Sequence, residues 1–331
     1  MISNRSELHL TTPTARVRGP QLGAGLCGIL MALSTACPAV AQTTWSQNGH
    51  AYQLVMASSS WTGAAAAAQA MVFEGQSGYL ATITSAAESA FLVAQFGGTA
   101  LNTVWIGGSD AQNEGTWRWV TGPEAGSQFW MGGVAGAPPS GQFANWGSNE
   151  PNNFNDEDYA CWSIGTWGPT LAAGQWVDAN DLGVNAFIVG YLVEFDCPTA
   201  SVSLTAGCPA GPHSLGGPQL QFGGLPALGT TFDIVGTLVH ATPFCLLLVG
   251  DPMPAVSLAP LGSFTGSSVC VAPLLVISSM AAVPALVSIA LPSAPTYCGL
   301  RFEVQWVDLD VNSLLPLPLG TSQSGSFRIG L

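Results

Sequence analysis

Residues 145–159 read NWGSNEPNNFNDEDY, and this stretch decides the interpretation of the chain. It combines the tripeptide Glu150-Pro151-Asn152 with three consecutive acidic residues at 156–158. Carboxylates and amide carbonyls are hard oxygen ligands that suit calcium, which takes six to eight oxygens in a flexible shell. A proline between two ligand-bearing residues can hold a cis peptide bond and turn both side chains the same way. We therefore predict a calcium site here, and the alternative is a solvated acidic loop.

The first 41 residues have the order of a secretory signal peptide. Basic residues precede the apolar run 22–33, and the small residues Ala39-Val40-Ala41 follow it. We predict cleavage after Ala41 and a secreted or cell-surface protein. The alternatives are a lipoprotein site at Ser34-Thr35-Ala36-Cys37 and an uncleaved anchor. The longest weakly polar stretch, 22–36, is shorter than the roughly 20 apolar residues that a membrane-spanning helix needs. No membrane insertion of the mature chain is therefore expected.

The mature chain would be strongly acidic. The whole chain of 331 residues has six arginines, no lysine and 19 acidic residues. Cleavage after Ala41 removes three arginines and Glu7, which leaves 18 acids, three arginines and a formal charge of −15. Nucleic acids and anionic lipids are bound through Lys and Arg contacts. The charge therefore excludes a nucleic-acid partner.

Composition divides the mature chain in two. Ten of the eleven tryptophans lie between Trp45 and Trp176, whereas the chain after Pro198 is rich in Pro, Gly, Leu and Val and nearly uncharged. We predict one domain at 42–198 and another at 199–331. In the second, short apolar runs alternate with Gly/Pro turns, which is typical of an antiparallel β-sandwich. We identify no family for this second region.

The first domain is predicted to be α+β. Ser60 can cap a helix that contains Trp61 and the run Ala64–Ala68. Ser85 and Glu88 have capping-box spacing for a second helix, in which each side chain would satisfy the other residue's amide. Strand-like runs lie at Ala51–Val55, Val104–Ile106, Trp117–Val120, Tyr159–Ile164, Gln175–Val177 and Gly190–Phe195. No regular period is found from 121 to 158, and a loop of that length is usually functional.

The cysteines are predicted to form disulfides. Six follow the predicted cleavage point: Cys161, Cys197, Cys208, Cys245, Cys270 and Cys298. Their spacing does not suit zinc, and an exported chain reaches an oxidising compartment. We expect the last four to pair among themselves. Cys161 and Cys197 would then bridge each other, or Cys197 would pair with Cys208.

Residues from about 45 to 196 resemble the C-type lectin-like domain. The resemblance rests on the order and spacing of short motifs, each of which is weak alone. They are Trp105-Ile106-Gly107-Gly108, Glu114-Gly115-Thr116-Trp117, Asn145-Trp146, Glu150-Pro151-Asn152, Glu157-Asp158-Tyr159, Trp176-Val177-Asp178 and Tyr191-Leu192-Val193-Glu194-Phe195. The resemblance implies an α+β double-loop domain whose long loop binds ligand, followed here by an all-β sandwich-like domain.

In that family, a calcium ion that contacts the sugar is held by a Glu-Pro-Asn motif, a later glutamate and a Trp-Asn-Asp motif. The residues implied here for both calcium and sugar binding are Glu150, Asn152, Glu157 and Asp178. The fifth position differs from the family pattern. Val177 replaces the family's asparagine and offers no side-chain oxygen. The Glu-Pro-Asn form resembles mannose-type binders, which prefer equatorial 3- and 4-hydroxyls. The valine removes one calcium ligand and one hydrogen bond to the sugar.

A second, structural calcium in the family uses an aspartate and a glutamate after the central strand. Asp110 and Glu114 match those positions with the right spacing, and the implied site is completed by Asn153, Glu157 and Asp158.

Both disulfides of the family are missing here. The places of the first appear to be held by Ala68 and Val193, and those of the second by Tyr159 and Asp181. Bacterial-type versions of the domain tolerate this loss.

The expected function is that of an exported, non-enzymatic protein that binds calcium and a glycan or glycoprotein. No Ser/His/Asp or Cys/His set with a supporting motif is found. Paired carboxylates such as Glu150 and Glu157 lack a recognisable glycosidase scaffold. The alternative is an adhesion or surface-structural module whose loop binds a protein surface, and Val177 favours it.

Several aromatic residues and one histidine need separate interpretation. The tryptophans expected in the core are Trp105, Trp117, Trp119 and Trp176. Those in or near loops, one of which is a candidate ligand contact, are Trp130, Trp146 and Trp167. His50 is expected to be a polar edge residue without a partner.

Overall fold

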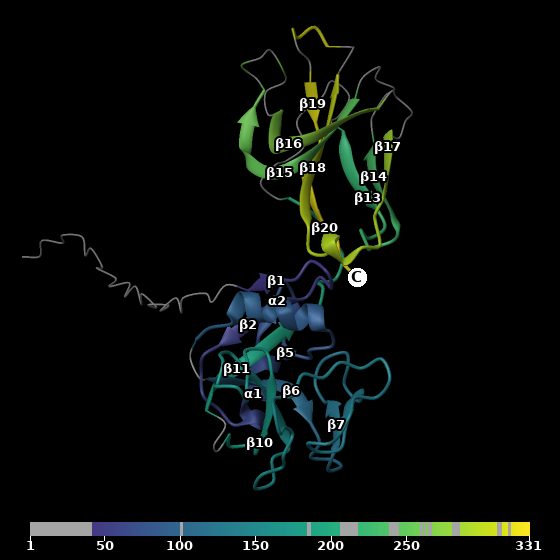
Figure 1. The fold of residues 1–331 in the computed structure, drawn as a ribbon. Helices are drawn as coiled ribbons and strands as arrows, with labels where there is room; N and C mark the ends of the chain where they lie inside the picture. The colour runs from purple at the N-terminus through teal and green to yellow at the C-terminus, as the bar shows by residue number, and fades with distance from the viewer. Residues whose placement is uncertain are drawn as a thin grey trace, which may run out of the picture. The chain divides into compact units, whose positions relative to one another are not determined.

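The computed structural model describes residues 42–99, 102–183, 187–205, 218–237, 245–258, 260, 263, 267–279, 285–309, 313–316 and 319–331. The predicted signal peptide and Cys208 lie outside these ranges. In the part of the chain described, no helix has the length and apolar character needed to cross a membrane. Two α-helices and many short strands form the first region, and the chain from residue 201 is rich in strands (Figure 1). The α+β class followed by a β-rich region is thus confirmed.

A nine-stranded sheet organises the first region. Its main path is β1 (Thr43–Thr44), β2 (Ala51–Val55), β11 (Ile188–Phe195), β6 (Thr103–Ser109), β7 (Thr116–Trp119) and β8 (Gln128–Met131). Off this path lie β5 (Tyr79–Leu80), β9 (Tyr159–Ser163) and β10 (Trp176–Ala179). β11 pairs parallel with β6 and antiparallel with β2, so strands from both ends of the region lie side by side. A separate small hairpin joins β3 (Val72–Phe73) and β4 (Gln76–Ser77).

Two capped helices accompany this sheet. α1 (Trp61–Ala70) begins at Ser60, whose Oγ accepts from the amide of Gly63 at 3.0 Å. α2 (Ala86–Phe96) begins at Ser85, whose Oγ accepts from the amide of Glu88 at 3.1 Å. Only this half of the predicted capping box forms, because the Glu88 carboxylate accepts from the amide of Thr84 at 2.8 Å.

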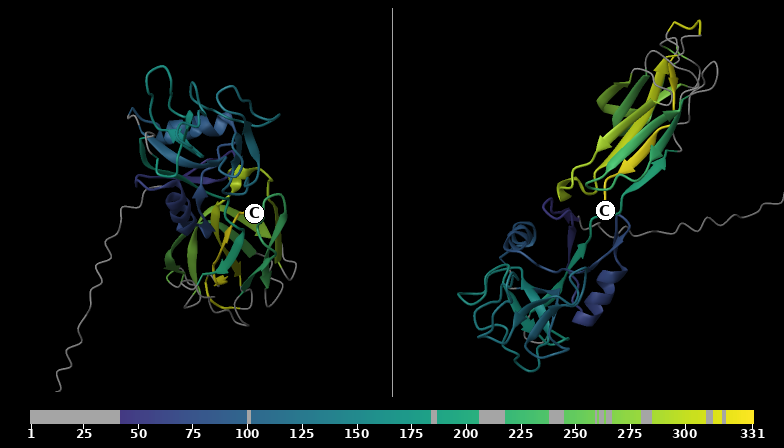
Figure 2. Two further views of the ribbon diagram at one scale, coloured as in Figure 1. Left: turned by 90° about the horizontal axis from the view of Figure 1, so that it is seen from below. Right: turned by 90° about the vertical axis from the view of Figure 1, so that its right-hand side faces the viewer.

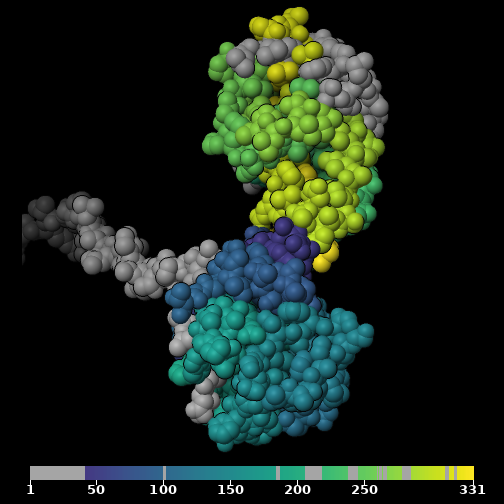
Figure 3. All heavy atoms as spheres, in the orientation of Figure 1, coloured from purple at the N-terminus to yellow at the C-terminus, as the bar shows by residue number. Residues whose placement is uncertain are grey.

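Tryptophans from the strands fill the core, as predicted. Each of the four expected there is at most 1% exposed. The long loop is anchored on them, because Phe129 stacks on Trp119 with ring centroids 4.4 Å apart and Trp146 meets Trp117 edge-on at 4.8 Å. In the space-filling view, the teal atoms that include this loop form a continuous surface of the first region (Figure 3).

Two sheets form the second region. The six-stranded sheet contains β12 (Ser201–Leu204), β20 (Gly325–Arg328), β18 (Arg301–Leu309), β15 (Cys245–Ser257), β16 (Ser268–Ser279) and β19 (Leu319–Thr321). The three-stranded sheet contains β13 (Gln219–Gly223), β14 (Thr231–Thr237) and β17 (Ala285–Ala290), and a short 3-10 helix spans Pro295–Tyr297. Phe232 and Ile234 from the smaller sheet share one buried cluster with Trp306 from the larger. The sheets therefore pack face to face (Figures 1 and 2).

One disulfide corrects the sequence prediction. Cys197 pairs with Cys298, with Cα atoms 5.9 Å apart, so the last four cysteines do not pair only among themselves. Cys197 lies two residues after β11, and Cys298 directly follows the 3-10 helix. The two cysteines are 101 residues apart, so their spacing in the sequence did not predict the pair. Cys270 is also disulfide-bonded. Cys161 does not pair with Cys197 but is a free thiol, buried on β9 where Trp105 and Val177 are its strand neighbours.

Candidate functional site

The four residues predicted to bind calcium and sugar line one pocket of about 430 Å³. They are Glu150, Asn152, Glu157 and Asp178. The Glu150–Pro151 peptide bond is cis, as expected. Asn152 Nδ2 donates to Glu150 Oε2 at 2.6 Å, which places these two side chains together. The long loop and strand β10 thus contribute to a single concave site.

Asp178 fixes the loop to the sheet. It lies on β10, is 4% exposed, and its carboxylate accepts from the amides of Asn152 at 3.1 Å and Asn153 at 2.7 Å. Asn153 Oδ1 accepts from the amide of Glu157 at 2.8 Å, and Glu157 Oε2 accepts from the amide of Phe154 at 3.2 Å. The candidate side chains are therefore held by backbone amides of the loop that carries them.

Some of the asparagines in the loop are explained by the backbone conformation that they adopt. Asn149, Asn153, Asn155 and Asp156 all have positive φ angles, between 50° and 67°. Asparagine and aspartate adopt this left-handed backbone more readily than other residues with a side chain. The composition that predicted oxygen ligands thus also reflects the sharp turns of the loop.

The carboxylates of the pocket are crowded and partly desolvated. Burial raises the pKa of Glu150 to about 9, and its hydrogen bond with Asp178 and the charge of Asp178 add to the effect. Burial also raises the pKa of Glu157 to about 7, again with the charge of Asp178 adding. A cation placed among these groups would oppose both effects, because an opposite charge favours the ionised carboxylate.

A second acidic cluster lies where β6 ends and β9 begins. The ligand atoms of Asp110, Glu114 and Asp158 lie within 4.8 Å of one another, and no other such group of three occurs among the residues described. Asp110 is 2% exposed, and its Oδ2 accepts from the amide of Gly115 at 2.8 Å. Its buried Oδ1 has no hydrogen-bond partner in the described part of the structure. Burial, with the charges of Glu114 and Asp158 adding, raises the pKa of Asp110 to about 7.

This cluster fits a cation. Burying a carboxylate oxygen without a hydrogen-bond donor costs free energy, and a bound cation would remove that cost. It contains three of the five residues predicted for the structural calcium. The other two, Asn153 and Glu157, are engaged in the loop hydrogen bonds described above.

The pocket also has apolar and hydroxyl-bearing lining that the sequence prediction largely missed. The apolar residues are Phe154, Trp167, Leu171 and Val177, and the hydroxyl-bearing residues are Thr103, Ser148 and Thr170. Trp167 is the loop tryptophan that reaches the pocket, while Trp130 and Trp146 pack against the core. Three of these residues, Trp167, Thr170 and Leu171, come from the segment 164–175, which has no periodic pattern in the sequence. Of the three, only Trp167 was a candidate from the sequence.

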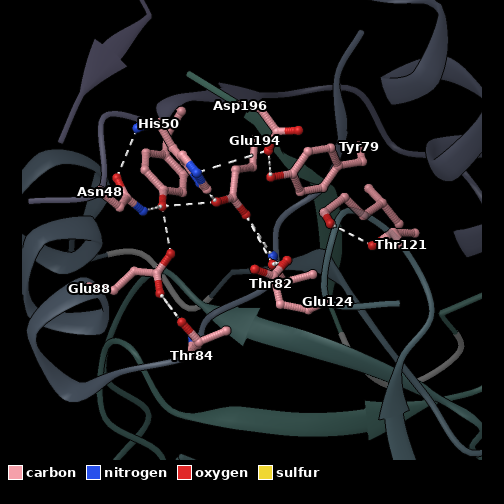
Figure 4. A network of polar contacts seen from close by, with 12 residues as sticks. Asn48, His50, Tyr79, Thr82, Thr84, Glu88, Thr121, Glu124, Glu194 and Asp196 are labelled. Atoms are coloured by element: carbon pink, nitrogen blue, oxygen red, sulfur yellow. Dashed lines mark hydrogen bonds and ion pairs between the residues drawn. The ribbon is translucent and has the colours of Figure 1, made fainter. Parts of the chain in front are cut away.

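A buried polar network joins β2, α2 and β11 (Figure 4). His50 Nδ1 lies 2.6 Å from Glu194 Oε1, so the expectation that His50 has no partner is wrong. Tyr52 Oη donates to Glu88 Oε1 at 2.5 Å and lies 3.1 Å from Glu194 Oε1. The second oxygen of Glu194 accepts from the amide of Thr82 at 2.9 Å. The network was missed because its members are 36 to 144 residues apart in sequence.

Sequence comparisons with known proteins find relatives of the first region. Residues 57–188 match the family model described as lectin C-type domain. Halomucin of Haloquadratum walsbyi is 37% identical over 158 residues, which cover 48% of this chain but only 2% of halomucin. Lectin BRA-3 of Megabalanus rosa is 28% identical over 176 residues, which cover 53% of this chain and 91% of BRA-3.

Among solved structures, the C-type lectin CEL-I from Cucumaria echinata aligns with 21% identity and a TM-score of 0.35, over 48% of this chain and 97% of that one. The family match and the lectin relatives cover the first region, and the second has no family match. On the match of the family model, residues 57–188 of the chain resemble the lectin C-type domain.

Proposed function

We propose that this protein binds carbohydrate through calcium held in the pocket of the long loop. Glu150, Asn152, Glu157 and Asp178 would supply oxygens to the ion and hydrogen bonds to two neighbouring hydroxyls of the sugar. The observation that carries the proposal is that residues from the loop and from β10 line one pocket. The lectin C-type domain match supports the same conclusion. Mannose-type sugars are the first candidates, because the Glu-Pro-Asn motif is intact.

A second calcium would brace the loop. Asp110, Glu114 and Asp158 supply closely spaced oxygens, and the unsatisfied Oδ1 of Asp110 favours a cation there. Calcium at this cluster would replace repulsion among the carboxylates with attraction and would fix the end of β6 relative to the start of β9. Asn153 hydrogen-bonds both Asp178 and the amide of Glu157, so a loop braced by this calcium would also hold those two residues of the sugar site in place.

The proposed biological setting is export without catalysis. The protein would act outside the cell or at its surface, after cleavage at Ala41, with a glycan or glycoprotein as partner. The β-rich region at 199–331 would present or anchor the lectin domain.

The test is a glycan screen of the purified protein in millimolar calcium and again in EDTA. Binding of a mannose-type sugar that is lost in EDTA supports the proposal, and a screen without any calcium-dependent binder contradicts it. A thermal melt in the same two buffers shows whether calcium binds at all. Calcium at 100 times its dissociation constant adds about 2.7 kcal/mol to stability.

A second function, protein binding in adhesion, is favoured by one observation. Val177 lines the pocket without offering an oxygen, which weakens the sugar-binding set. The variant Val177→Asn separates the two functions. A weakened sugar site gains affinity for sugar when the missing ligand is restored, whereas a protein-binding surface does not.

A further inference from the structure

Strand β16 of the second region carries a run of exposed apolar residues. In the part of the chain described, β16 ends the six-stranded sheet and pairs only with β15. Residues 272–276, Ala-Pro-Leu-Leu-Val, are all exposed. Leu274 is 72% exposed, Leu275 55% and Val276 49%. Single exposed apolar residues are common on protein surfaces, but a consecutive run of them marks an interaction site.

This run continues the apolar layers of the sheet as far as its edge. Leu275 lies opposite Val249 of β15, and Val276 lies opposite Leu248. Residues opposite each other on antiparallel strands share a face of the sheet. Val249 and Leu248 are each 7% exposed and belong to two different buried clusters. Both layers therefore reach β16 and lose their cover there, and we call residues 272–276 the edge surface.

The distribution of charge identifies the partner that fits the edge surface. The chain has a formal net charge of −13, yet from Pro252 to Leu300 it contains no Asp, Glu, Lys, Arg or His. Two copies of the protein repel each other through their acidic surfaces, but the edge surface adds no repulsion and gains free energy when it is buried. A basic partner would be attracted instead to the acidic clusters of the first region. The matching surface is therefore the edge surface of a second copy.

We propose that two copies of this protein associate through their edge surfaces, related by a two-fold axis, so that each copy covers Leu275 and Val276 of the other. The same patch on both copies gives an interface that closes after two. Pro273 has no backbone N–H, and a proline in an edge strand opposes extension of the sheet. The contact is therefore made by side chains. The edge surface shares no residue with the pocket of the long loop, so this inference stands apart from the proposed function.

The test is analytical ultracentrifugation of the purified protein over a series of concentrations, in millimolar calcium and again in EDTA. The wild type should show a monomer–dimer equilibrium that is the same in both buffers. Leu275→Gln should raise the dissociation constant of the dimer at least about tenfold, because the dimer loses apolar burial at two symmetric places. Leu204→Gln is the matched control. Leu204 is 54% exposed and lies on β12, the other edge strand of the same sheet, so this variant should dimerise like the wild type.

Four results would overturn the inference. They are a wild type that stays monomeric at its highest soluble concentration, a dimer that Leu275→Gln leaves equally tight, a dimer that Leu204→Gln weakens as much, and association that continues beyond two copies. A monomeric wild type that binds phosphatidylcholine vesicles, with binding lost in Leu275→Gln, would assign the edge surface to lipid instead. Thermal melts of both variants that match the wild type show that lost association is not a folding defect.

Discussion

Glu88 offers the sharpest test of the electrostatics of the buried network. Its side chain is buried on α2 and contacts the Tyr52 hydroxyl and the amide of Thr84. Burial raises its pKa from 4.5 to about 7, and the charge of Glu194 adds to the effect. Burial lowers the pKa of His50, but the hydrogen bond with Glu194 and its charge outweigh this and leave the pKa raised.

The sign of the pH dependence follows from these values. A carboxyl whose pKa is higher in the folded protein holds its proton more tightly there than in the unfolded chain. Its contribution to stability is complete below about pH 4.5 and is lost as the pH rises through about 7. The difference between the two pKa values corresponds to about 3 kcal/mol of unfolding free energy. The raised pKa of His50 acts in the same direction.

The perturbation is Glu88→Gln, in which an amide of the same shape needs no proton. Relative to the wild type, the variant should gain about 2 to 3 kcal/mol as the pH rises from about 5 to about 8. Urea denaturation at several pH values measures this difference, and the loop carboxylates cancel because both proteins share them. Asp251→Asn, at an exposed carboxylate on β15, serves as the control and should follow the wild type. Parallel pH profiles for Glu88→Gln and wild type would refute the reasoning.

Three further predictions concern the cation cluster, a helix cap and the disulfide. Asp110→Asn should reduce the calcium-dependent rise in Tm, because it removes a charge from the cluster that Asp110 forms with Glu114 and Asp158. If calorimetry shows the same rise in the variant as in the wild type, the ion binds elsewhere. Ser60→Ala should cost about 1 kcal/mol in urea denaturation, since the amide of Gly63 loses its partner, and a cost near zero would contradict the capping role. Cys298→Ser should cost about 2 to 5 kcal/mol, because it opens a bridge between residues 101 apart; a variant as stable as the wild type under oxidising conditions would show that this bridge does not contribute.

Local patterns in the sequence were sufficient for most of the fold. The two serine caps marked the starts of both helices, and the tryptophan-bearing runs marked strands of the sheet. Both features depend on residues close in sequence, so the sequence alone shows the capping hydrogen bonds and the alternation of buried side chains that they require. β8 was missed because its four residues lie in the aperiodic stretch from 121 to 158 and owe their strand structure to pairing with β7.

The site was predictable only where a motif was intact. Glu150, Asn152 and Asp178, which the resemblance singled out, line the same pocket, and their role as calcium and sugar ligands stays a prediction. Leu171 and Ser148 gave no signal, because a lone apolar or hydroxyl residue in a loop has many possible environments. Contacts over long separations were equally invisible, as the pairing of His50 with Glu194 illustrates.

The central claim is that calcium and sugar bind together at the residues of the long loop and β10. Its most direct test is equilibrium binding of one monosaccharide, such as mannose, to the wild type and to Asp178→Asn, each in calcium and in EDTA. The Asp178 carboxylate accepts from two loop amides and lines the pocket, so its replacement removes both a candidate calcium ligand and the link to the loop. The sugar should bind only to the wild type, and only when calcium is present. Binding that survives in EDTA, or in a folded Asp178→Asn variant, would contradict it.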